Sequence, residues 1–325
     1  MRIALAGKAG SITHWLEDVA AAWRADGHQV GLAITRRPWL AAQAEAALAG
    51  LIAERLRAAL RRFSPDLIVV IGGYHIPEAL LEAISGLPGR PPLAGWVGDV
   101  FTPEDAGRAR LYDLVAYADS ALLARHRQWA LAAEALYLPH AVDPHAAPRA
   151  RGFEERDPRM VFVANPTPLR RAVVSAITAP IAVFGPGWRG VDGGAHDVHS
   201  GRVAARRVPA IYGGHRAALN IRNELNVLSG LNQRNFEPCL AGAALLTDDQ
   251  PDLAACFDPG SEVLVWRDAD ELNALYRRIL AETNFAARVA AAGRARVVAQ
   301  HTFAHRLQTL AEALRLPLPK PRGRA

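Results

Sequence analysis

The chain has 325 residues, half of them apolar and 22% charged, which is enough for two globular domains with a core in each. The net charge is +6, but Lys8 and Lys320 are the only lysines, and arginines alternate with acids along most of the chain. No nucleic-acid-binding motif is present, so we do not expect a nucleic-acid partner. No apolar run reaches the roughly 18 residues of a membrane span. A weak attraction to anionic lipid or to phosphorylated substrates stays open.

The two cysteines, Cys239 and Cys256, lie in apolar contexts without metal-ligand or disulfide spacing. We therefore expect a reducing, cytoplasmic location, with at most a peripheral association with the inner face of the membrane. The N-terminus has the pattern of a first strand and not of a secretory signal. The histidines of the second half are irregularly spaced and lack nearby carboxylates, so no structural metal is predicted.

The first half alternates strand and helix patterns. Apolar strands are predicted at residues 2–7, 30–35, 66–72, 93–97, 114–117 and 135–138. A helix is predicted over 11–25, and a longer one has Leu48, Ile52, Leu56 and Leu60 on one face. Strands that alternate with helices indicate right-handed crossovers and a doubly wound parallel sheet.

The second half repeats this alternation after a segment rich in Pro, Arg and acids. Strands are predicted at 160–164, 181–184, 217–221 and 243–246, a helix at 169–177, and a long polar loop at 189–202. Asp268 and Glu271 have the spacing of a capping box at the start of an amphipathic helix. The last helix starts after Thr302 and is ended by Pro317.

These patterns predict an α/β protein with two doubly wound, Rossmann-like domains that face each other across a cleft. The predicted parts are an N-terminal domain (1–145), a linker (146–158), a C-terminal domain (159–302), a helix that crosses back to the first domain (303–316) and a disordered basic tail (317–325). In such sheets the ligand binds beyond the carboxyl ends of the strands. The loops that follow the strands are therefore the places to search for a site.

Residues 231–253 are the most informative stretch of the second domain. Pro238 suits the first turn of a short helix, and Gly242 suits its end. Arg234 precedes that helix start, where free N–H groups bind anions, and Glu237 is placed to accept hydrogen bonds from sugar hydroxyls. With Arg170 and Arg222, Arg234 makes a set of guanidinium groups that suits a diphosphate. The alternative is an ordinary helix–strand unit with solvated charges.

The first domain contains three candidates for a general base toward a hydroxyl acceptor: His14, His75 and Asp99. Asp99, at a strand end, is preferred, and its alternative role is to cap the next helix. Gly10 and Ser11 suit an anion or a sugar hydroxyl, or only a tight turn. A phosphate-binding P-loop, a dinucleotide-binding glycine pattern and a hydrolase nucleophile elbow are all absent from the sequence.

Ordered motifs over residues 160–310 resemble the CgeB-like, or spore-maturation-protein-like, glycosyltransferases, which have the two-lobed GT-B fold. The motifs are Asn220-Ile221-Arg222, Arg234-Asn235-Phe236-Glu237, Leu246-Thr247-Asp248, Pro259-Gly260-Ser261-Glu262 and His301-Thr302-Phe303 with Arg306. The first domain matches more loosely, through residues 96–100 and 138–144.

The resemblance implies a nucleotide-sugar donor held by the second domain and an acceptor held by the first. The implied donor residues are Arg170, Gly187, Trp188, Arg222, Asn232, Arg234, Glu237, Gly242 and Asp248. Asp99 and His14 are the implied catalytic residues, and Gly10, Ser11 and His75 the acceptor or phosphate loop. Related enzymes often have a second Glu eight residues after the first. That position is Leu245 here, so the ribose contact falls to Glu237 alone or to Asp248.

The resulting hypothesis is a glycosyltransferase that moves a sugar from a nucleotide-diphosphate sugar to a hydroxyl acceptor. No metal or other cofactor is expected, because arginines can neutralise the leaving diphosphate. Two alternatives remain: a sugar-nucleotide epimerase with the same two lobes, and a nucleotide-sugar-binding or assembly protein without turnover. The sequence leaves open the donor base and sugar, the acceptor, the stereochemical outcome and the oligomeric state.

Overall fold

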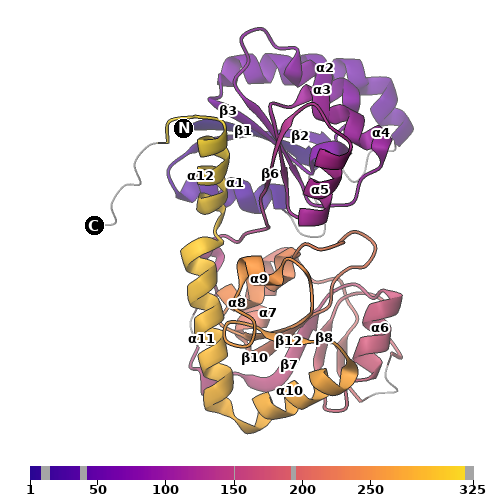
Figure 1. The fold of residues 1–325 in the computed structure, drawn as a ribbon, viewed down its shortest axis with the longest axis vertical. Coiled ribbons are helices and arrows are strands. Elements are labelled where there is room, and N and C mark those ends of the chain that lie inside the picture. The colour runs from indigo at the N-terminus through magenta and orange to yellow at the C-terminus, as the bar shows by residue number, and fades with distance from the viewer. Residues whose placement is uncertain (9–14, 37–41, 150, 192–194, 319–325) are drawn as a thin grey trace. The chain divides into compact units, whose positions relative to one another are not determined.

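A computed structural model describes residues 1–8, 15–36, 42–149, 151–191 and 195–318 (Figure 1). The chain divides into two compact units. Unit 1 comprises Met1–Pro139 with Phe303–Ala325, and unit 2 comprises His140–Thr302. The division thus precedes the segment 146–158, whose composition suggests a linker. That segment belongs to unit 2, and its last two residues begin the first strand there.

Unit 1 contains a six-stranded parallel sheet in the order β2-β1-β3-β4-β5-β6. The strands are β1 (Arg2–Lys8), β2 (Gln29–Arg36), β3 (Leu67–Ile71), β4 (Leu93–Val97), β5 (Leu114–Tyr117) and β6 (Glu134–Tyr137). Every residue of β3, β4 and β5 is buried, as expected for strands covered by helices on both faces. The predicted parallel sheet of the first half is confirmed.

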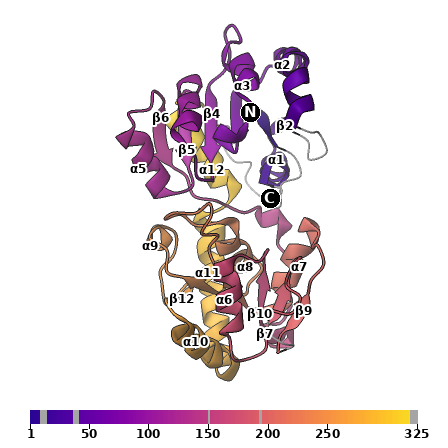
Figure 2. The same cartoon turned by 90° about the vertical axis from the view of Figure 1, so that its right-hand side faces the viewer.

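The helices of unit 1 are α1 (Trp15–Ala25), α2 (Ala42–Phe63), α3 (Glu78–Ser85), α4 (Pro103–Ala106), α5 (Ser120–Gln128) and α12 (Phe303–Ala313). The last of these comes from the other end of the chain and packs on α1 (Figures 1 and 2). The indole N–H of Trp23 donates to the carbonyl of Phe303 at 2.9 Å, and Arg306 Nε donates to the carbonyl of Pro139 at 2.7 Å. These buried contacts attach α12 to unit 1.

Unit 2 also contains a six-stranded parallel sheet, in the order β12-β11-β10-β7-β8-β9. The strands are β7 (Asp157–Val163), β8 (Ala182–Phe184), β9 (Asp197–His199), β10 (His215–Asn220), β11 (Ala244–Asp248) and β12 (Leu264–Trp266). β9 lies inside the predicted loop at 189–202, so that prediction is wrong for these three residues. Such a short edge strand without buried residues has no apolar alternation to reveal it.

The helices of unit 2 are α6 (Pro168–Ser175), α7 (Val208–Gly213), α8 (Glu237–Leu240), α9 (Leu253–Cys256), α10 (Ala269–Ala281) and α11 (Thr283–Gln300). Asp268 caps α10 as predicted and accepts a hydrogen bond from the Glu271 amide at 2.9 Å. At Gly293 the α11 helix lies very close to the backbone of Glu262. A Cβ atom at this position would lie 2.5 Å from the carbonyl oxygen of Glu262, which is too close for any residue other than glycine.

None of the helices that the model describes combines the length and the apolar character that crossing a membrane would require. Residues 319–325 of the predicted basic tail (317–325) lie outside the described residues.

Candidate active site

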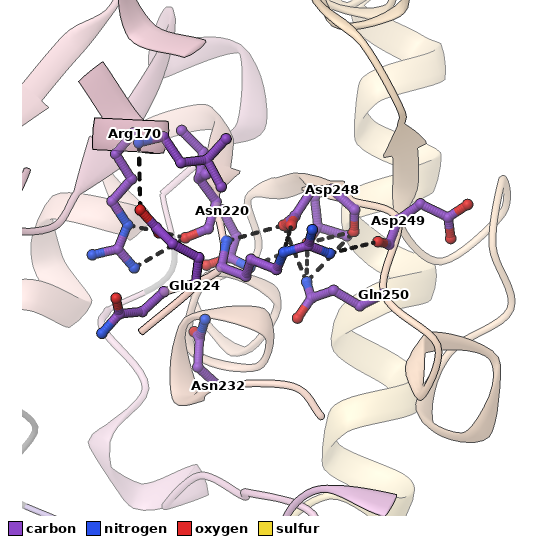
Figure 3. Close-up of polar contacts among 12 residues, drawn as sticks. Arg170, Asn220, Glu224, Asn232, Asp248, Asp249 and Gln250 are labelled. Carbon is purple, nitrogen blue, oxygen red and sulfur yellow. Dashed lines mark hydrogen bonds and ion pairs between the residues drawn. The ribbon is translucent and has the colours of Figure 1, made fainter. Parts of the chain in front are cut away.

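The strand order of unit 2 changes direction between β7 and β10. After β7 the chain continues to β8 and β9 on one side of the sheet, and then returns to place β10, β11 and β12 on the other. At such a point the loops after the two central strands separate and leave a crevice at the carboxyl edge. The polar side chains described below follow β7, β10 and β11 at this edge (Figure 3).

Arg170, in the first turn of α6, spans the two central strands. Its Nε and Nη2 donate to the carbonyl of Ile221 after β10, at 3.2 and 3.0 Å, and Nη1 donates to the carbonyl of Asn165 after β7, at 3.0 Å. The residue is only 3% exposed. Burial, followed by the neighbouring charge of Arg234, lowers the pKa of Arg170 to about 10. The guanidinium is thus held by the dipoles of two backbone carbonyl groups, and no carboxylate in the described part of the chain contacts it directly.

Asp248 ends β11 on the other side of β10. Its Oδ1 accepts the backbone N–H of Arg222 at 3.1 Å and the amide of Gln250 at 3.1 Å, while the Arg222 side chain lies 3.7 Å from Oδ2. Burial raises the pKa of Asp248 to about 6, against the opposing effects of these partners. The raised pKa shows that the interactions with Arg222 do not fully offset the loss of solvent around this carboxylate.

A neutral polar network lies between these charged groups. The Asn220 amide, at the end of β10, donates to Asn235 Oδ1 at 3.2 Å and to the Thr247 hydroxyl oxygen at 3.1 Å. Asn235 and Gln250 also donate to Thr247 Oγ1, at 3.0 and 3.2 Å. All four residues are buried. This network fixes the ends of β10 and β11 relative to the segment 232–235.

Asn232, Arg234 and Glu237 approach the same edge from the chain before β11. The Asn232 side chain caps a short 3-10 turn by accepting the Arg234 N–H at 2.8 Å. Glu237 begins α8, and burial raises the pKa of its carboxyl group, whereas Arg234 opposes that shift. The charges of Arg170, Arg234 and Glu237 also act on the buried phenol of Tyr212. The structure therefore groups the three predicted donor residues of this segment.

Several buried polar atoms in this region have no hydrogen-bond partner in the described part of the chain. They are Tyr212 Oη, Asn220 Oδ1, Asn232 Nδ2, Gln233 Oε1, Arg234 Nε and Gln250 Oε1. An unpaired buried donor or acceptor is unfavourable by about 1–3 kcal/mol, so such groups are rarely retained without a function. Their concentration at one sheet edge indicates a surface built for a polar ligand.

Three predicted donor residues, Trp188, Gly187 and Gly242, have mainly structural roles. Trp188 is fully buried, and its indole N–H donates to the carbonyl of Ala164 at 2.7 Å. Gly187 has φ +85°, so it forms the turn beside that indole. Gly242 has φ +76° and closes α8, with the guanidinium of Arg156 3.2 Å from the place of a Cβ atom. These residues shape the site without presenting a polar side chain to it.

In unit 1 the structure brings two predicted residues together. His75 follows β3 and Asp99 follows β4, and their Nε2 and Oδ2 atoms are 3.7 Å apart. Both side chains are about half exposed. The pair lies at the carboxyl edge of the unit 1 sheet, where a ligand of a doubly wound domain is expected. Gly10, Ser11 and His14 lie outside the described residues.

Sequence reasoning selected the loop at 222–224 and the stretch at 231–253 but assigned no role to Glu224, Gln250 or Tyr212. Glu224 accepts hydrogen bonds from the Thr167 hydroxyl at 3.0 Å and from the Leu169 amide at 3.4 Å. The first two residues follow strand ends, which is the signal that could have found them. Tyr212 belongs to α7, and only the tertiary structure places it here. Among the described residues, no cluster of three or more His, Cys, Asp or Glu side chains could hold a metal ion.

Comparisons of the sequence and of the fold with known proteins both find similarity to sugar-transferring enzymes. Residues 168–312 match the family model described as "Glycosyl transferase-like". The chain is similar to the sucrose-phosphate synthase of Thermosynechococcus elongatus, with 13% identity, TM-score 0.67 and coverage of 97% of this chain and 98% of that one. The search of curated proteins gives no match.

Two further structures are similar and have nucleotide sugars in their titles. HepE of Anabaena in complex with UDP-glucose has 13% identity, TM-score 0.67 and coverage of 97% of this chain and 99% of that one. The E. coli protein titled "Trehalose-6-phosphate", bound with UDP-2-fluoro glucose, has 13% identity, TM-score 0.64 and coverage of 98% and 100%. At this identity the likeness establishes the fold, and the family model establishes the enzyme class. The protein is a glycosyltransferase with the two-domain GT-B fold.

Proposed function

We propose that unit 2 binds a nucleotide-diphosphate sugar at the carboxyl edge of β7, β10 and β11, and that the sugar is transferred to a hydroxyl acceptor held by unit 1. The observation that supports this most strongly is the combination of Arg170, Arg222 and Arg234 with the unpaired polar atoms at the same edge. Guanidinium groups bind phosphate oxygens through charge-assisted hydrogen bonds. The unpaired amide and hydroxyl atoms suit the hydroxyls of ribose or of the transferred sugar.

Charge development explains why arginines are useful here. When the bond between the anomeric carbon and the phosphate oxygen breaks, negative charge increases on the diphosphate. Fixed cations that are already oriented stabilise that charge without reorganisation. Arg170 is fixed by three hydrogen bonds to two carbonyl groups, whereas Arg234 has an Nε without a partner among the described residues. We therefore assign the positioning of the diphosphate to Arg170 and a direct contact to Arg234, without a metal ion.

Glu237 and Asp248 are the two predicted donor residues that have carboxyl groups. Because burial raises the pKa of both, each gains from a ligand that supplies hydrogen-bond donors. Sugar hydroxyls are such donors. We therefore assign a contact with a sugar hydroxyl to Glu237, the first residue of α8. Leu245 is buried in a core cluster, so it offers no replacement for a second Glu.

For the acceptor we propose the His75–Asp99 pair of unit 1, with Asp99 as the base if the reaction inverts the anomeric configuration. The motifs over residues 160–310 further support a CgeB-like subfamily. UDP and UDP-glucose are the first ligands to test, because they are bound in similar structures.

The test is a thermal-shift and calorimetric titration of the full chain with nucleoside diphosphates, followed by turnover assays with the donor that binds. Arg234→Ala and Glu237→Ala are expected to weaken binding at least tenfold while the chain remains folded. If both variants keep full donor affinity and turnover, the site assignment is wrong. A product formed from donor alone would show an epimerase, and binding without turnover for any acceptor would show a binding protein.

A further inference from the structure

The N-terminus of α6 lies inside the proposed donor site, and its amide groups are already paired within the chain. Pro168 has no N–H, the Leu169 amide donates to Glu224 Oε1 at 3.4 Å, and the Arg170 amide donates to Thr167 Oγ1 at 3.3 Å. The Arg171 amide donates to the Thr167 carbonyl at 2.9 Å. A helix start of this kind is normally available to an anion. Here a carboxylate from another loop takes that position.

Glu224 comes from the loop after β10 and contacts the segment that begins α6. Its second oxygen accepts the Thr167 hydroxyl at 3.0 Å, so the carboxylate is held by two donors from the segment that begins α6. Its negative charge also acts on the buried guanidinium of Arg170, which no carboxylate of the described residues contacts directly. Glu224 thus places a carboxylate at this helix start, near the charge of Arg170 (Figure 3).

The ionisation of Glu224 supports the same picture. Burial alone raises its pKa, but hydrogen bonds from its own backbone N–H, from the Thr167 hydroxyl and from Leu169 outweigh burial and lower the pKa overall. The group is therefore a carboxylate at neutral pH. A diphosphate brought to the same helix start meets a like charge, and two anions cannot share these donors.

We propose that Glu224 stands in for a phosphate of the donor at the start of α6 and is displaced when the nucleotide diphosphate binds. This inference rests on the proposed function. It makes Glu224 an internal competitor that keeps Arg170 and the first turn of α6 organised between turnovers. Displacement of Glu224 weakens donor binding, because the hydrogen bonds of its carboxylate must first be broken. When the carboxylate returns to the start of α6, it favours release of the nucleoside diphosphate.

The ordinary alternative is that Glu224 only stabilises the start of α6. Both roles predict a slightly less stable protein when its charge is removed, because a negative group near a helix N-terminus is favourable. They differ in binding. A competitor predicts tighter diphosphate binding after the change, whereas a purely structural residue predicts unchanged or weaker binding.

The decisive experiment is calorimetric titration of the full chain and its Glu224→Gln variant with UDP and, separately, with inorganic pyrophosphate at pH 7.5 and constant ionic strength. The glutamine oxygen can still accept the Leu169 N–H, and its NH2 group can donate to the Thr167 hydroxyl oxygen, so both contacts are possible while the charge is lost. We expect both probes to bind the variant on the order of tenfold more tightly, because one like charge is removed from the site. Glu282→Gln, an exposed carboxylate paired with Arg278, is the matched control and is expected to change neither affinity.

The outcomes separate the inference from the proposed function. If the unmodified chain binds UDP and Glu224→Gln binds UDP and pyrophosphate equally or more weakly, the inference is overturned and the donor site stands. If neither protein binds either probe, both the inference and the proposed donor site fail. Tighter binding by the variant, together with a melting temperature equal to or slightly below that of the unmodified chain, supports the displacement.

Discussion

Asp248 offers a quantitative test of how unit 2 balances stability against ligand binding. The pKa of this carboxyl group is raised from 3.8 to about 6 because the side chain is buried at the end of β11. Replacing Asp248 with Asn removes the charge but keeps the shape. The amide oxygen can still accept the N–H of Arg222 and the amide of Gln250, which both bond to Oδ1.

The direction of the pH dependence follows from the raised pKa. The folded protein binds this proton more tightly than the unfolded chain, so stability is lost as the pH rises from about 4 to about 6. About two pKa units correspond to about 3 kcal/mol at pH 8, and roughly half of that is already lost at pH 5. Asp248→Asn is neutral throughout and avoids this loss.

We therefore expect Asp248→Asn to be more stable than the unmodified chain by up to about 3 kcal/mol at pH 8, and by about half as much at pH 5. For a domain of this size the difference at pH 8 corresponds to an increase in melting temperature of roughly 6–12 °C. Differential scanning calorimetry at both pH values measures it. Donor turnover is expected to fall at the same time, because stability and activity often oppose each other at binding sites.

Asp249→Asn is the matched control for this measurement. Asp249 is adjacent in sequence but half exposed and paired with Arg267 at 3.1 Å, so its removal is expected to change stability by less than about 1 kcal/mol. If Asp248→Asn is no more stable than the unmodified chain at pH 8, or if its advantage does not shrink toward pH 5, then burial of the carboxylate is not the source of the raised pKa.

Three further predictions follow from the same site. Tyr212→Phe removes a buried hydroxyl without a partner in the described chain, so we expect a stability gain of about 1 kcal/mol with weaker donor binding; a loss of stability in urea unfolding would show that the hydroxyl is paired. Gly242→Ala places a Cβ atom close to Arg156 on a residue with φ +76°, so we expect the protein to be destabilised by about 1–2 kcal/mol in thermal melts. Gly201→Ala is the control in the same melts, because the space around Gly201 is open. Turnover is expected to survive EDTA, because arginines supply the positive charge; activity that returns only with added Mg²⁺ would contradict the metal-independent assignment.

Local patterns in the sequence were sufficient for most of the architecture. The apolar run at 67–71 can be satisfied only by burial on both faces, and β3 is accordingly buried throughout. Asp268 is a helix cap because its side chain bonds an amide three residues away, a purely local interaction. Motif order also predicted that Arg170, Arg234 and Glu237 belong to one site, since parallel strands bring their carboxyl ends to the same edge.

Other features depend on contacts between residues far apart in sequence. The sequence predicted that Trp188 and Arg170 bind ligand. In the structure both side chains are buried and donate hydrogen bonds to backbone carbonyls, which the sequence alone does not indicate. Glu224 meets the start of α6 across 55 residues of sequence, and Tyr212 approaches the site from a helix with no motif of its own. The residue types and their periodicity thus determined the two parallel sheets and most of their strands, but not the three-residue strands β9 and β12. Which polar atoms are left unpaired, and which carboxylate occupies the helix start, was decided by tertiary packing, because these properties depend on the distances and solvent exclusion that arise only when the loops of several strands meet.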